Sequence, residues 1–144
     1  MKKLTRTLSF VALVGALVVA LAVPAIAANT PTQWRTKADA VCKAAGGELS
    51  ALASQQGLSG ASQPTIEQVK AYAVVAQPIY RKAFNDIEAI PAPAKLKAKV
   101  KKFLATFRSA VDKMTSVASL TEYSNNFKPA SKQATQLKLK DCAG

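Results

Sequence analysis

Histidine is absent from the 144-residue sequence, and cysteine occurs only twice. Without imidazole the chain lacks the usual general base of enzymes that work near neutral pH, the commonest metal ligand and the Glu-x-x-His pairs of di-iron bundles. Two cysteines without a C-x-x-C spacing are a poor zinc or redox set. The eight acidic residues are scattered, and no glycine-rich phosphate-binding motif occurs. We therefore expect a protein that is not an enzyme and that uses no metal and no cofactor.

The first 27 residues have the three parts of an export signal. Lys2, Lys3 and Arg6 precede an uncharged apolar stretch at residues 8–23, and Pro-Ala-Ile-Ala follows at residues 24–27. Small side chains at these last positions suit a signal peptidase. An uncleaved anchor is the alternative, but a bilayer span needs about twenty apolar residues. We predict cleavage after Ala27 and no transmembrane segment in the chain that remains.

The remaining domain, residues 28–144, holds 17 basic and 8 acidic residues and has a net charge of +9. Its apolar residues recur at intervals of three and four, which predicts an all-α fold. Four such stripes joined by short turns favour an antiparallel four-helix bundle. The stripes run from Trp34 to Leu52, from Ile66 to Ile90, from Leu96 to Val117 and from Tyr123 to Leu137. The aromatic residues expected in the core are Trp34, Phe103, Phe107 and Phe127.

Capping-box spacings mark three helix starts, at Thr30 with Gln33, at Thr65 with Gln68, and at Ser119 with Glu122. Residues 54–62 are rich in turn formers and form the longest predicted loop.

Glycines and prolines interrupt the stripes. The Gly46-Gly47 pair predicts either a bend in the first helix or the close approach of another backbone. Pro78 and Pro129 lie inside the second and last helices and predict kinks there. The sequence Ile-Pro-Ala-Pro at residues 90–93 is expected to end the second helix and begin the third.

Cys42 and Cys142 lie 100 residues apart, near the two ends of the exported domain. Disulfides persist outside the cytosol, so we expect the two to pair. Residues 139–142 are expected to leave the last helix to reach Cys42. Such a bond would stabilise the fold by about 4 to 5 kcal/mol at most.

Five lysines crowd the start of the third helix, on the face opposite its apolar stripe. They are the candidate anion-binding residues Lys95, Lys97, Lys99, Lys101 and Lys102, called the lysine cluster below. An anionic polymer or lipid surface is the partner that such a face would meet, although charge of this kind also serves solubility alone. Phe103 and Phe107 fall on the apolar side, which argues against base stacking and specific nucleic-acid recognition.

Several short motifs resemble a widespread group of small exported helical proteins from actinobacteria. They are Ala-Asp-Ala-Val-Cys at 38–42 with Leu49 and Leu52, Ala-Tyr at 71–72 with Pro-Ile at 78–79, the Ile-Pro-Ala-Pro joint at 90–93, and Leu-Lys-Leu-Lys-Asp-Cys at 137–142. That group has no established function, so the resemblance implies an exported, disulfide-tied helical bundle and no catalytic or binding residue. Many members carry a lipidation cysteine, which this chain lacks.

Two other functions fit the same pattern. The first is a carrier of a small apolar ligand or haem, held where the Gly46-Gly47 pair, Pro78 and Pro129 would open a gap between helices. Its iron ligand would come from Tyr72, Tyr80, Tyr123 or Met114. The second is a protein that acts on membranes through amphipathic helices, although a bundle also buries such stripes without lipid. The sequence favours a secreted or cell-envelope binding or structural protein whose basic surface meets an anionic partner.

Overall fold

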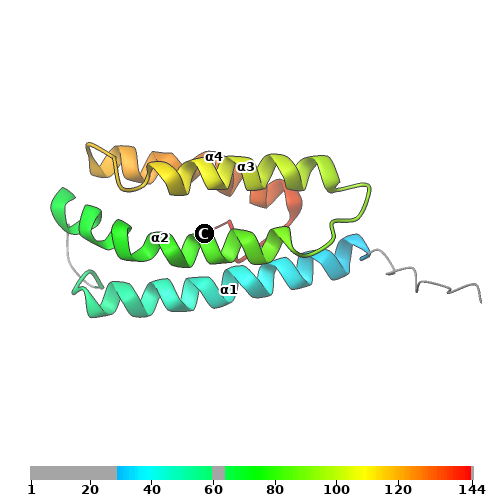
Figure 1. Ribbon diagram of the computed structural model, residues 1–144, viewed down its shortest axis with the longest axis horizontal. Helices are drawn as coiled ribbons and strands as arrows, with labels where there is room; N and C mark the ends of the chain where they lie inside the picture. Colours follow the sequence, from blue (N-terminus) through cyan, green and yellow to red (C-terminus); the bar gives the residue numbers. More distant parts are fainter. Residues whose placement is uncertain (1–28, 60–63, 144) are drawn as a thin grey trace, which may run out of the picture.

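The computed structural model describes residues 29–59 and 64–143, which form four α-helices and no strand. The helices are α1 (Pro31–Gln55), α2 (Ile66–Glu88), α3 (Lys97–Lys113) and α4 (Leu120–Leu137). They lie alongside one another as a bundle (Figure 1). The all-α prediction is therefore confirmed for this part of the chain. The predicted signal peptide, residues 1–27, and residues 60–62 of the predicted loop lie outside the described residues.

The predicted capping residues start three of the helices. Thr30 and Thr65 each form a complete capping box with the glutamine three residues later, before α1 and α2. Ser119 accepts a hydrogen bond from the backbone N–H of Glu122 at the start of α4. The carboxylate of Glu122 accepts from the N–H of Ala118 at 2.7 Å and not from Ser119, so this third box is only half formed.

The helix α3 begins later than predicted. Proline at position 93 is followed by a turn in which the N–H of Leu96 donates to the carbonyl of Pro93 at 2.8 Å. The first helical residue is Lys97, so Lys95 precedes the helix. The proline joint thus ends α2 as predicted, but one extra turn separates it from α3.

No other described part of the chain approaches α1 closely at its two glycines. The helix continues through Gly46 and Gly47, and a Cβ atom added to either residue would meet no other atom within 4 Å. Of the two alternatives for this pair, the close approach of another backbone is therefore excluded. The two glycines leave open space beside the helix instead.

The core of the described residues consists of two clusters of buried side chains. The first contains Trp34 and Phe103 with the C-terminal half of α4, and the second contains Ala73, Ala76, Val111 and Met114. Phe107 packs against both clusters. Trp34 and Phe103 are buried as predicted. Phe107 and Phe127 are only partly buried, so the prediction that they lie in the core is correct only in part.

The helices pack mainly on their neighbours in sequence, α1 on α2, α2 on α3 and α3 on α4. Lys138 ends α4 in the left-handed conformation, with φ of 61°, and turns the chain out of the helix. The segment 138–143 then runs back from α4 toward the middle of the molecule, shown in red in Figure 1. It bridges the two outer helices.

Candidate functional site

A disulfide joins the segment 138–143 to α1. The sulfur atoms of Cys42 and Cys142 are 1.97 Å apart and their Cα atoms 5.2 Å apart, which agrees with the predicted pairing. The chain leaves α4 after Leu137, close to the predicted point of exit.

Two hydrogen bonds from the same face of α1 support the disulfide. The guanidinium Nε of Arg35 donates to the carbonyl of Leu137 at 2.8 Å, and the carboxylate of Asp39 accepts from the N–H of Asp141 at 3.1 Å. Arg35, Asp39 and Cys42 are spaced by four and three residues, so they lie on one side of the helix. Three contacts along α1 thus fix the position of the returning chain.

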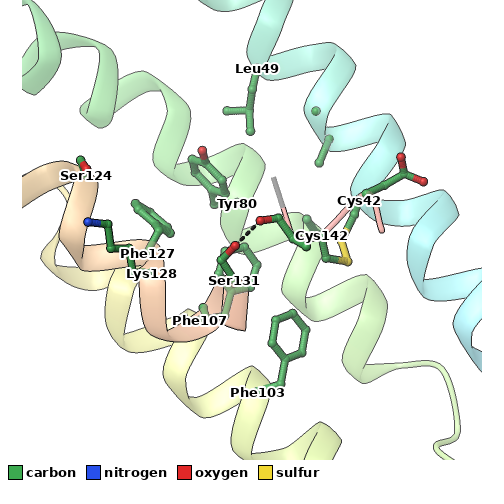
Figure 2. A pocket seen from close by; sticks show the side chains of 16 residues that line it. Cys42, Leu49, Tyr80, Phe103, Phe107, Ser124, Phe127, Lys128, Ser131 and Cys142 are labelled. Atoms are coloured by element: carbon green, nitrogen blue, oxygen red, sulfur yellow. Dashed lines mark hydrogen bonds between the residues drawn. A yellow bond between two sulfur atoms is a disulfide. The ribbon is translucent and has the colours of Figure 1, made fainter. Parts of the chain in front are cut away.

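A cavity of about 370 Å³ lies next to this junction and is lined by all four helices and the segment 138–143. Figure 2 shows Leu49 and Cys42 on one side of it, Phe127 and Lys128 on the other, and Tyr80, Phe107 and Phe103 between them. Gly46 and Lys128 are both lining residues and both exposed, so the cavity opens to solvent. We call it the α1–α4 cavity.

Small side chains create the space. The cavity is lined by Ala45 and Gly46 from α1, Ala83 from α2 and Ala130 from α4. These small side chains extend only a short distance from their helices. The two core clusters therefore do not meet at this height of the bundle.

Aromatic rings form the walls. The Phe107 ring lies 5.9 Å from the ring centres of both Phe103 and Tyr80, and the Tyr80 and Phe127 rings are stacked at 5.4 Å. The four rings are joined through Phe107 and make a continuous apolar surface. Phe107 and Phe127, which are both partly buried, line this open space on one side and pack against the core on the other.

Few polar groups line the cavity. The hydroxyl of Ser131 donates to the carbonyl of Ala143 and so holds the end of the segment 138–143. Burial raises the pKa of Tyr80 above its usual value, with smaller contributions from Tyr123 and Tyr72, so its phenol stays protonated. The charged lining residues are Lys128 and Asp141. The cavity therefore offers mostly apolar contact, with charge only at its edges.

Most of the predicted iron ligands lie outside the cavity lining. Tyr80 is the one member of the four predicted iron ligands that lines the cavity. Met114 is fully buried in the second core cluster, and burial raises the pKa of Tyr72 and brings that of Tyr123 to about 12.

The lysine cluster is a separate feature. Its five side chains are exposed, and none of them lines the α1–α4 cavity. Three ion pairs occur among the described residues, Arg81 with Asp112, Lys82 with Asp86 and Arg108 with Glu88, and none involves the cluster. The structure thus keeps the five charges on the surface and apart from the apolar site.

Two further observations bear on function. In residues 29–59 and 64–143 no three His, Cys, Asp or Glu side chains gather where they could hold a metal ion, and no helix there is both long and apolar enough for a membrane crossing. Comparisons of the chain with protein-family models, with curated proteins and with solved structures found no match.

Sequence reasoning found part of the site and missed part. It singled out Gly46, Tyr80 and the two cysteines, but not Ser124 or Ser131. The signal in the sequence was the presence of small residues in several of the apolar stripes. Small side chains that lie at the same height of a bundle leave space between its helices.

Proposed function

We propose that the protein is an exported, non-catalytic binding protein that holds a small apolar ligand in the α1–α4 cavity. The apolar, open cavity is the observation that carries this proposal. Its volume of about 370 Å³ falls in the usual range for small-molecule sites, about 300 to 1,000 Å³. Such sites have apolar and aromatic walls with a few polar groups, as this one does.

The proposal includes the finer features of the fold. We propose an antiparallel bundle in which α2 and α4 bend at Pro78 and Pro129, both of which lie inside helices. Proline removes a helical hydrogen bond and clashes with the preceding turn. Tyr80 and Phe127 each lie two residues from a proline, so these bends would shape the cavity walls.

Export is also part of the proposal. Cleavage after Ala27 would release residues 28–144 as a secreted or envelope protein, in line with the resemblance to exported helical proteins of actinobacteria. The Cys42–Cys142 pair supports this location, because disulfides persist outside the reducing cytosol.

The neighbouring glycines of α1 provide a matched test of the cavity. Gly46 lines it and Gly47 does not, although both are exposed and helical. We expect Gly46→Leu to weaken binding of the neutral apolar fluorophore N-phenyl-1-naphthylamine at least tenfold, because the new side chain occupies the cavity. Gly47→Leu should leave binding unchanged.

Both substitutions replace glycine inside a helix, which favours the helix by up to about 1 kcal/mol, so loss of fold does not explain a difference between them. Fluorescence titration of the disulfide-bonded domain measures the affinity. Absence of binding by the unsubstituted protein, or equal affinities of the two variants, would count against a cavity ligand.

We propose the lysine cluster as a second binding surface, for an anionic polymer or lipid surface. The observation that favours it is the exposure of five lysines within eight residues, none of them in the ion pairs of the described structure. A phosphate-bearing polymer carries condensed counterions. Each phosphate that a lysine of such a surface neutralises releases a counterion, and this release strengthens binding.

Polyphosphate binding at increasing salt tests the second surface. Replacing Lys97, Lys99, Lys101 and Lys102 with glutamine should flatten the salt dependence of binding and weaken it at least tenfold. The control variant carries glutamine at four exposed lysines elsewhere, Lys37, Lys43, Lys70 and Lys113. An equal loss in both variants would mean that net charge alone attracts the polymer.

A further inference from the structure

The two edges of the α1–α4 cavity carry opposite charges. Lys128 lines the cavity from α4, with Ser124 one helical turn before it. Asp141 lines it from the segment 138–143, directly before Cys142. Lys128 and Cys142 lie on opposite sides of the cavity in Figure 2. The lining thus contains one cation, on α4, and one acidic residue, on the segment 138–143.

Lys128 is placed to receive an anion. Its side chain is exposed and takes no part in the three ion pairs of the described structure. The apolar stem of a lysine packs along an apolar wall while its ammonium stays at the water boundary. The hydroxyl of Ser124 adds a possible donor on the same face of α4, four residues earlier.

The interior suits an aliphatic chain. Between the two charged edges the lining is formed by Tyr80, Phe103, Phe107 and Leu49 with small residues, and it contains no charged group. Each CH₂ group buried there strengthens binding about fourfold. Asp141 repels an anionic head group, so the head group is favoured at the Lys128 end.

The size of the cavity limits the ligand to a single chain. A volume of about 370 Å³ lies near the lower limit of small-molecule sites, about 300 Å³, and leaves little room for a lipid with two acyl chains. The positive charge of the domain as a whole also attracts anionic amphiphiles more than cationic ones.

We infer that the cavity binds a single-chain amphiphile with an anionic head group, held at Lys128, and with its apolar chain among the aromatic rings. This inference rests on the proposed function and specifies the chemistry of the ligand. It does not depend on the lysine cluster, none of whose residues lines the cavity.

Ligands that share one chain and differ in head-group charge test the inference. Isothermal titration of the disulfide-bonded domain at pH 7, with dodecanoate, 1-dodecanol and dodecyltrimethylammonium below their micelle concentrations, should give the tightest binding for the anion and the weakest for the cation. Dodecyl phosphate distinguishes a phosphate head from a carboxylate. Preference for either anion over the alcohol supports the inference.

Three variants of α4 locate the head group. Lys128→Met should weaken dodecanoate binding about tenfold, equivalent to about 1.4 kcal/mol, and leave dodecanol binding unchanged. Lys128→Arg should keep the preference for the anion. The matched control is Lys132→Met, since Lys132 is an exposed lysine one turn later that does not line the cavity.

The outcomes separate this inference from the proposed function. Equal binding of all three head groups, or equal losses in Lys128→Met and Lys132→Met, would overturn the inference and leave a cavity for neutral ligands intact. Failure of all the ligands to bind, together with no binding of the neutral fluorophore, would overturn both.

Discussion

Replacing Trp34 with alanine is expected to lower the free energy of unfolding by about 3 to 5 kcal/mol. Trp34 is fully buried and has the largest side chain of the first core cluster. Its removal would leave a cavity where α1 meets the rest of the bundle, because well-packed surroundings relax only in part. Small domains have a total stability of about 5 to 15 kcal/mol, so the variant would lose a large share of it.

Denaturant unfolding of the disulfide-bonded domain, followed by circular dichroism, measures this loss. The variant Trp34→Phe sharpens the test. The indole Nε1 of Trp34 is buried without a hydrogen-bond partner, and such an orphan group costs about 1 to 3 kcal/mol. Phenylalanine fills most of the space and removes the orphan N–H.

We therefore expect Trp34→Phe to lose less than half as much stability as Trp34→Ala. A near-zero effect of the alanine variant would show that α1 does not dock through Trp34. Equal losses in the two variants would mean that the indole N–H has a partner, such as a bound water molecule.

Removing the disulfide should have an effect of similar size. Replacing both Cys42 and Cys142 with alanine opens a covalent loop with a sequence separation of 100 residues. The chain entropy that the bond removes from the unfolded state corresponds to about 4 to 5 kcal/mol. The double variant is preferred to a single one because it leaves no free thiol.

The measurement compares the denaturant midpoint of the double variant with that of the oxidised protein. An unchanged midpoint would show that the bond contributes nothing to stability. A second readout concerns the α1–α4 cavity, because Asp141, Cys142 and Ala143 form one wall of it. Under conditions where the helical signal is retained, the variant should bind the neutral fluorophore more weakly than the oxidised protein.

The helical content and three of the helix starts followed from local features of the sequence. Helix starts at Thr30, Thr65 and Ser119 were predictable because a side-chain cap acts within four residues. The disulfide was predictable because only one pairing is available to two cysteines. The predicted start of α3 was one turn too early, because the two prolines determine where α2 ends but not where the next helix begins.

The cavity could not be predicted in the same way. Its small residues Ala45, Ala83 and Ala130 come from three helices and are far apart in the sequence. An apolar stripe shows which side of a helix faces inward, but not which residues of other helices stand at the same level. For the same reason Phe107 and Phe127 were expected in a filled core, whereas they border an open space.

The position of the disulfide has a consequence for the time course of folding. Helices that are neighbours in the chain pack together early, because their contacts are close in sequence. Cys42 lies in α1 and Cys142 follows α4, so the bond cannot form until all four helices have been synthesised and brought together. The wall made by residues 141–143 is therefore among the last parts to take its place, and the rate of thiol oxidation sets how long the α1–α4 cavity lacks its covalently fixed wall in each new molecule.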